Sequence, residues 1–279
     1  MTPQSLDTGS PDLLATLDAG VLTLTMNRPE ARNAMSAGMN LALQQQLAAA
    51  ELNPAVRCVV LTGAGKGFCA GGDVKGMAAK SAKPGDGGVA AMTLDEAIAR
   101  QRLNQRATAG KLFKMAKPTI AALPGAAAGA GLALALACDL RLMASSAIMT
   151  TAFARVGFSG DYGGTYFMTQ LVGSAKAREL YFLSDRVSAD EALRLGLTNW
   201  VCPPDELAAK TREIALRLAK GPTVAYRYMK ENLNRAMAGE VDDCLDLEAT
   251  HHIHCGQTED HRAATQAFVD KREPVFTGR

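Results

Sequence analysis

The sequence lacks an excess of charge of either sign. Its 279 residues include 30 Lys and Arg against 28 Asp and Glu, which gives a formal net charge of +2. Dedicated nucleic-acid-binding domains are usually strongly basic, so this balance argues against such a role and against attraction to anionic lipid. Hydrophobic residues make up 48% of the chain. That share is enough for a substantial core and excludes a disordered chain.

Signals for export, membrane insertion and cross-linking are also missing. The cysteines at 58, 69, 138, 202, 244 and 255 have no CxxC spacing, which predicts free thiols and a cytoplasmic protein. The first residues show neither the basic nor the apolar part of a secretory signal. Residues 118–138 carry no charge, but Pro124 and Gly125 interrupt them. We therefore expect a strand, a turn and a helix there, and no membrane span.

The order of hydrophobic patterns predicts an α/β fold. Strands are expected at 56–62, 118–122, 140–144 and 148–150, with two more within 13–26, and helices at 36–52, 94–115, 129–137 and 164–171. After Val201 no strand signal appears, and amphipathic helices are expected at 205–220, at 223–237 and within 241–269. We predict an α/β core over residues 1–204 that holds the ligand site. Residues 205–279 would form a helical oligomerisation or lid region, and residues 77–93 a mobile surface loop.

Two glycine-rich segments are candidates for a ligand site. FCAGGD (68–73) follows a predicted strand, and GAAAGAG (125–131) begins a predicted helix. Glycine lets a ligand approach the backbone, and the first amides of a helix have no internal partner. Two such amides that converge would stabilise a developing oxyanion. On spacing alone, however, turn formation is the commoner role of such glycines, and neither segment matches a nucleotide-binding motif.

The same segments resemble the enoyl-CoA hydratase/isomerase (crotonase) superfamily. The motifs are FCAGGDVK (68–75), KPTIAALPGAAAGAGLALALACDLRL (117–142), GFSGDYGGT (157–165) and SADEALRLGLTNWV (188–201), and the likeness extends from 27–35 to 271–279. It implies a crotonase-type spiral of ββα units with a C-terminal helical region, assembled as trimers or pairs of trimers. The implied substrates are acyl-CoA thioesters, whose enolate is held by two backbone amides. No separate cofactor is implied, because CoA is part of the substrate.

The resemblance also implies roles for individual residues. Matched motif by motif, the two oxyanion amides belong to Gly72 and Ala130. Lys75 matches a position that often meets the CoA phosphates, with a solvated lysine as the alternative, and Asp73 is more readily a turn-stabilising residue than an acid. The substrate-binding residues expected in total are Ala70, Gly71, Asp73, Lys75, Gly129, Phe153, Phe158 and Tyr162.

Family hydratases use two glutamates, and this sequence lacks both. The matching positions hold Ala133 and Phe153, which cannot move protons, whereas hydration needs one group to activate water and another to deliver a proton. Asp161 remains as a candidate. A matching acid transfers the proton in dienoyl-CoA isomerases and in the ring isomerase of the phenylacetate pathway, and is the nucleophile in 4-chlorobenzoyl-CoA dehalogenase. From the sequence alone, a helix N-cap or an Asx turn is the alternative for Asp161.

The motifs AAGAG (127–131), AFARVG (152–157) and DYGGT (161–165) resemble most closely the branch of 2-(1,2-epoxy-1,2-dihydrophenyl)acetyl-CoA isomerases. We therefore predict an acyl-CoA isomerase of fatty acid or aromatic acid degradation. Asp161 would be its single base, with a pKa raised by the neighbouring aromatic side chains. A hydratase with a non-standard acid/base set and a catalytically inactive acyl-CoA binder are the alternatives. An RNA-binding role, known for one family member, has little support from the charge balance.

Histidine is absent from the first 250 residues. All four histidines (251, 252, 254 and 261) lie in the predicted C-terminal helices. The dehalogenase reaction needs a core histidine to activate water, so the sequence disfavours that branch. No Cys/His spacing completes a metal site, and we expect these histidines at a polar interface or on an exposed helix face.

Overall fold

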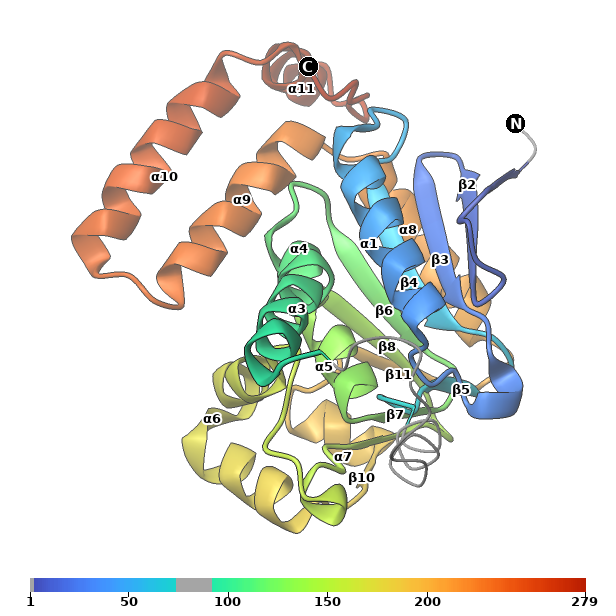
Figure 1. Ribbon diagram of the computed structural model, residues 1–279. Helices are drawn as coiled ribbons and strands as arrows, with labels where there is room; N and C mark the ends of the chain where they lie inside the picture. Colours follow the sequence, from blue (N-terminus) through green and yellow to red (C-terminus); the bar gives the residue numbers. More distant parts are fainter. Residues whose placement is uncertain (1–2, 74–91) are drawn as a thin grey trace.

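A seven-stranded sheet forms the centre of the structure, a computed structural model that describes residues 3–73 and 92–279 (Figure 1). The strands lie in the order β1-β2-β3-β4-β6-β8-β11, and those from β3 to β11 run parallel. Their bounds are β1 Gln4–Leu6, β2 Leu13–Asp18, β3 Val21–Met26, β4 Cys58–Gly63, β6 Thr119–Leu123, β8 Leu140–Ala144 and β11 Trp200–Cys202. The inner strand β6 is buried along its whole length, as expected for a parallel strand covered on both faces.

A smaller sheet continues three strands of the large one. Its order is β10-β9-β7-β5, with β5 at Gly67–Cys69, β7 at Ala126–Ala128, β9 at Ile148–Thr150 and β10 at Val187–Ser188. Strand β5 follows β4, β7 follows β6 and β9 follows β8, and a helix follows each pair. The predicted α/β fold of repeated ββα units is therefore confirmed.

Helices cover both faces of the large sheet. α1 (Ala37–Leu52) packs against β2 and β3, and α8 (Leu207–Ala219) packs against β3, β4, β6 and β8 on the opposite face (Figure 1). The bounds of α1 agree with the sequence, because Ser36 caps its first turn through the amide of Met39 at 3.0 Å. α5 (Ala130–Ala137) is buried at every residue and lies between α4 (Ala109–Lys114) and α6 (Gly164–Leu183). Among the described residues, no helix is both long and apolar enough to cross a membrane.

Several local predictions were wrong. The helix expected at 94–115 is two helices, α3 (Leu94–Ala107) and α4, which are separated at the buried Thr108. The helix expected at 164–171 corresponds to the first part of α6, which Gly173 ends with φ 76° and ψ 164°, and the second part up to Leu183 was not predicted. β7 was not predicted, and α7 (Ala189–Arg194) was missed although Ser188 caps it and acidic residues occupy its first turn. Trp200 lies in a strand-like run, which predicts a core position, but it is 37% exposed on the edge strand β11. Most of the predicted loop 77–93 lies outside the described residues.

Three further helices follow α8. α9 (Thr223–Ala236) and α10 (Val241–Gly256) form a pair that extends beyond the sheets, and α11 (Glu259–Val269) follows (Figure 1). After α11 the chain returns to the large sheet, where the Arg57 guanidinium donates to the carbonyls of Phe276 (3.0 Å) and Gly221 (2.8 Å).

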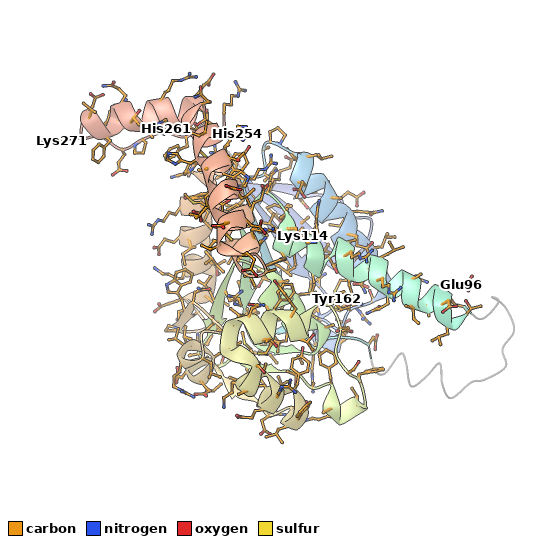
Figure 2. The ribbon with its side chains drawn as sticks, turned by 90° about the vertical axis from the view of Figure 1, so that its left-hand side faces the viewer. Glu96, Lys114, Tyr162, His254, His261 and Lys271 are labelled. Carbon is orange, nitrogen blue, oxygen red and sulfur yellow. The ribbon has the colours of Figure 1, made fainter. Side chains whose placement is uncertain are left out.

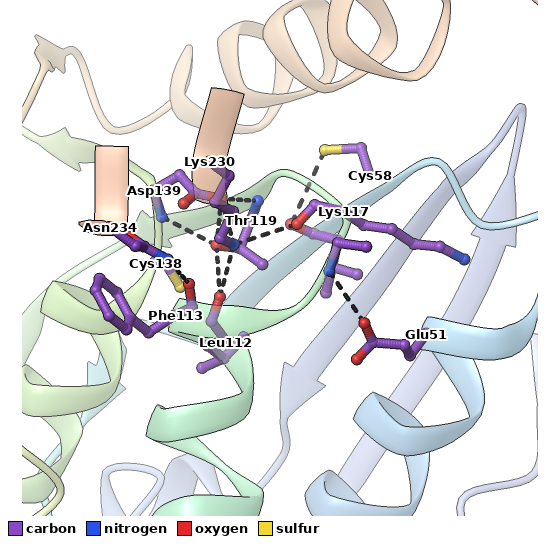
Figure 3. Close-up of polar contacts among 12 residues, drawn as sticks. Glu51, Cys58, Leu112, Phe113, Lys117, Thr119, Cys138, Asp139, Lys230 and Asn234 are labelled. Atoms are coloured by element: carbon purple, nitrogen blue, oxygen red, sulfur yellow. Dashed lines mark hydrogen bonds and ion pairs between the residues drawn. The ribbon is translucent and has the colours of Figure 1, made fainter. Parts of the chain in front are cut away.

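A buried ion pair attaches α9 to the sheet (Figure 3). The Lys230 ammonium is 7% exposed, and it donates to Asp139 Oδ2 and to the carbonyl of Leu112, both at 2.9 Å. Asp139 Oδ2 also accepts from the backbone N–H of Thr119 at 2.7 Å. Asp139 thus joins β6, β8 and α9.

Candidate active site

The two glycine-rich segments leave the small sheet side by side. β5 and β7 are parallel neighbours, with Cys69 opposite Ala127. Ala70, Gly71 and Gly72 therefore follow β5 beside the segment in which Gly129 connects β7 to α5. Parallel strands end at the same edge of a sheet, so the two segments meet there. Ala70 is held by its N–H, which donates to the carbonyl of Arg32 at 3.0 Å.

Gly71 allows the two segments to touch. Its φ is +87°, and a Cβ at this position would lie 2.8 Å from the carbonyl oxygen of Ala128 and 3.2 Å from the amide nitrogen of Ala130. A side chain there would be strained and would push the segments apart. The chain after β5 and the first turn of α5 are thus in direct backbone contact.

Two backbone amides at this contact have no acceptor in the described part of the chain. The N–H of Gly71 donates to Cys69 Sγ at 3.4 Å, and that of Gly129 donates to the carbonyl of Thr150 at 3.2 Å. The next amides, those of Gly72 and Ala130, have no acceptor among residues 3–73 and 92–279. Ala130 begins α5, where free N–H groups and the positive end of the helix dipole attract negative charge. Both amides lie at this contact, which makes them candidates for the donors of an oxyanion hole.

Asp161 lies on the loop between a short 3-10 helix (Ala154–Val156) and α6. Burial raises the pKa of its carboxyl from 3.8 to about 6. Its Oδ1 atom is buried and has no hydrogen-bond partner in the described part of the chain. The N-cap residue of α6 is Gly163, and no side chain caps the helix. The N-cap alternative for Asp161 is therefore wrong. A half-buried carboxyl without a partner is unfavourable for folding, and such groups cluster at functional sites.

Tyr162 connects Asp161 with the segment after β5. It adopts a left-handed backbone conformation with φ 48°, and its hydroxyl donates to Asn40 Oδ1 on α1 at 3.4 Å. Burial raises the pKa of Tyr162 to about 12, and the nearby Asp161 carboxyl and Cys69 thiol add to this shift. The predicted site residue Tyr162 therefore lies near both candidate elements. Nothing in the sequence near Asn40 indicates this contact, so Asn40 was not among the predicted site residues.

Phe153 and Ala133 lie close to the first turn of α5. The Phe153 ring is buried and lies beside Gly129, where an added Cβ would be 3.7 Å from it. It also stacks on Tyr181, with ring centroids 5.9 Å apart and an interplanar angle of 11°. Ala133 is fully buried on α5. Phe158, in contrast, is 56% exposed and therefore contributes little to the burial of Asp161.

Asp73 and Lys75 complete the predicted residues. The guanidinium of Arg28 donates to Asp73 Oδ2 at 3.3 Å and to the carbonyl of Ala34 at 2.8 Å. Asp73 thus holds the chain after Gly72 against the segment before α1, consistent with a turn-stabilising role. Lys75 lies outside the described residues.

The histidines lie on the C-terminal helices. Figure 2 shows His254 and His261 well away from Tyr162. The buried His251 stacks on Tyr228 of α9 at a ring distance of 4.3 Å, so it forms a polar interface between α9 and α10. In the ranges that the structure describes, no three His, Cys, Asp or Glu side chains are grouped as a metal would need.

Comparison with known proteins places this geometry in a family. The family model for enoyl-CoA hydratase/isomerase matches residues 16–279. The chain is 35% identical to 1,2-epoxyphenylacetyl-CoA isomerase of Escherichia coli (strain K12), over 96% of this chain and 98% of that protein. It is 34% identical to the short-chain-enoyl-CoA hydratase of Clostridium acetobutylicum, over 91% and 92%. The crystal structure of an enoyl-CoA hydratase from Polaromonas sp. JS666 superposes with a TM-score of 0.86 at 32% identity, covering 95% of this chain and 99% of that one.

Proposed function

Because the chain belongs to the enoyl-CoA hydratase/isomerase family, we propose that it is an acyl-CoA isomerase with Asp161 as its single base. The substrate is a 3-enoyl-CoA or a ring-epoxide acyl-CoA. Its CoA supplies the thioester that activates the reacting carbon, so the proposed reaction uses no further cofactor. The names of the relatives include both isomerases and hydratases, and the preference for isomerisation comes from the residues of this site.

One observation carries the proposal. Asp161 is a half-buried carboxyl with a pKa of about 6, and its Oδ1 atom has no hydrogen-bond partner among the residues that the structure describes. A base with a pKa near the working pH is deprotonated before the reaction and can still return its proton afterwards. The positions that match the two hydratase glutamates hold Ala133 and Phe153, both buried. A single carboxyl suits a proton shift, whereas water addition by the family's route needs two.

The reaction on a 3-enoyl-CoA follows from these groups. The Asp161 carboxylate takes a proton from C2, the C2–H electron pair forms the C1=C2 bond of a dienolate, and the carbonyl π pair moves onto the thioester oxygen. The N–H groups of Gly72 and Ala130 donate to that oxygen and stabilise the dienolate. Asp161 then gives the proton to C4, and the product is a 2-enoyl-CoA. When C4 is protonated, the oxygen pair restores the carbonyl, the C1=C2 pair becomes C2=C3, and the C3=C4 pair forms the new C4–H bond. Atoms and charge balance without water.

The test compares the wild type with Asp161→Asn in D₂O, with a 3-enoyl-CoA and a 2-enoyl-CoA as substrates. Mass, double-bond position and water addition are followed together. We expect bond migration with deuterium uptake in the wild type and its loss in Asp161→Asn. The control is Asp270→Asn, since Asp270 lies on the surface after α11 and pairs with Arg272. Water addition that persists in Asp161→Asn would instead indicate a hydratase with another acid/base set. Tight binding of acyl-CoA without any turnover would indicate a binder.

We also propose that the protein assembles through its C-terminal helices as a trimer or a dimer of trimers. Leu233, Ile253 and Phe268 are exposed on α9, α10 and α11, and exposed large apolar side chains in one region mark association surfaces. Light scattering coupled to size exclusion would give the mass of the assembly. A monomer at micromolar concentration would contradict this part of the proposal.

A further inference from the structure

The two ends of α6 lie against each other. Gly164 and Tyr181 are 17 positions apart (181 − 164) within α6, a separation that would span about 26 Å in an unbroken helix. A Cβ added to Gly164 would nevertheless lie 2.6 Å from the Tyr181 hydroxyl. The left-handed Gly173 turns the second half of the helix back onto the first. This break brings Tyr181 into the candidate active site.

Tyr181 contacts the Asp161 loop on both sides of Asp161. Its ring lies 3.2 Å from the Cβ position of Gly160, and its hydroxyl lies over Gly164. The Cβ of Ala133 lies 3.1 Å from the position that a Cβ on Gly164 would occupy. The Tyr181 hydroxyl, which lies near that position too, is therefore also close to the α5 turn that follows Ala130. The parallel ring of Phe153 supports the Tyr181 ring.

An unpaired donor and an unpaired acceptor are therefore neighbours. Within the described residues, the Tyr181 hydroxyl has no hydrogen bond, and the buried Asp161 Oδ1 has none either. The Asp161 charge acts on the Tyr181 phenol and helps to raise its pKa above the ordinary value, after burial as the larger cause. In free enzymes, catalytic hydrogen bonds are often long and form fully only when substrate is bound.

We propose that Tyr181 is a positioning residue for Asp161: when an acyl-CoA fills the site, the Tyr181 hydroxyl donates to one carboxylate oxygen and directs the other toward the substrate. This inference rests on the proposed function, because it assigns Asp161 as the base. A phenol that donates to the carboxylate stabilises its charged form and lowers its pKa in the substrate complex. Tyr181 would thus hold the base in place without touching the reacting atoms.

The test is Tyr181→Phe, which removes the hydroxyl and keeps the ring that stacks on Phe153. The hydrogen bond forms with substrate bound, so the acid limb of kcat, which reports the substrate complex, moves to higher pH by about one unit or more. The acid limb of kcat/KM, which reports the free enzyme, stays in place. At pH 7, kcat falls about tenfold with little change in KM. The matched control is Tyr166→Phe, because Tyr166 lies on the same helix and packs against Phe113 and Phe167.

Two further variants keep the outcome decisive. The double variant Asp161→Asn/Tyr181→Phe should be no slower than Asp161→Asn, because residues that act through one group are not additive. If Tyr181→Phe fails to fold, 3-fluorotyrosine at 181 keeps the ring and supplies a more acidic donor, which should move the acid limb of kcat to lower pH. Unchanged kcat and an unchanged limb in Tyr181→Phe would overturn the positioning role and leave Asp161 as the base. Isomerisation that survives Asp161→Asn would overturn the proposed function itself, and the inference with it.

Discussion

Replacing Asp161 by asparagine should remove activity and at the same time stabilise the folded protein. Burial raises the pKa of this carboxyl from 3.8 to about 6, so the folded state disfavours the charged form relative to the unfolded chain. Asparagine has nearly the same shape and carries no charge. The variant therefore relieves an unfavourable interaction, whereas most substitutions in a protein interior destabilise it.

The magnitude follows from the shift. A change from 3.8 to about 6 is about two pKa units, and each unit corresponds to about 1.4 kcal/mol between the two protonation states. Because the side chain keeps some contact with solvent, which screens the charge, we expect about 2 kcal/mol at pH 8. With an unfolding entropy of about 2.1 cal/mol/K per residue, this raises Tm by about 3 °C for 279 residues.

The pH dependence distinguishes this origin from others. Above pH 6 the Asp161 carboxyl is charged in both states, so the full penalty is present. Below pH 3.8 it is neutral in both states, and the penalty is gone. Between these values the folded state binds the proton more tightly, so the stability of the wild type falls as the pH rises. The advantage of Asp161→Asn over the wild type should therefore be largest at pH 8 and should disappear near pH 4.

The assay is urea unfolding of both proteins at pH 8, 6 and 4, with Asp139→Asn as the control. The Asp139 carboxylate accepts from Lys230 and from the Thr119 amide, so its neutralisation leaves a buried ammonium without a counter-charge. We expect that variant to lose about 3 kcal/mol at pH 8. The reasoning about Asp161 is refuted if Asp161→Asn is less stable than the wild type at pH 8, because Asp161 would then be held by favourable structural contacts.

Three other predictions follow from the site and its support. The wild-type kcat/KM should fall tenfold per pH unit below about pH 6, because Asp161 must be deprotonated; a flat profile down to pH 5 would contradict its role as base. Gly72→Pro removes one of the two proposed oxyanion donors and should lower kcat by about 10²–10³-fold with acyl-CoA binding retained in calorimetry. Gly173→Ala meets no atom within 4 Å but must adopt φ 76° and ψ 164°, so urea unfolding should show a loss of about 1–3 kcal/mol from backbone strain alone.

Much of the fold could be predicted because its signals are local. Helix α1 has a serine cap at its start and Asn53-Pro54 at its end, and the apolar run of β4 is typical of a buried parallel strand. Strand β7, in contrast, is three alanines whose conformation depends on pairing with β5 and β9. Such pairing is not local, so the sequence shows only a turn there.

The candidate site likewise has features that the sequence predicts and features that depend on tertiary packing. Its glycine-rich segments and Asp161 are visible in the sequence, because they are contiguous motifs. Whether Asp161 caps a helix or lies half-buried without a partner depends on how the loop packs, and only the structure answers it. Tyr181 was missed because nothing near it in the sequence shows that Gly173 folds α6 back. Residues that reach a site through a break in a helix lack any periodic signal.

The contact of Arg57 with Phe276 also determines when the fold can be completed during synthesis. The two residues are 219 positions apart, and at about 5–20 residues per second a ribosome takes roughly 11–44 s to make the chain between them. Throughout that time the Arg57 guanidinium lacks this carbonyl as an acceptor. The segment after α11 therefore joins β4 and the turn before α9 as one of the last steps, onto a sheet whose strands have all left the ribosome.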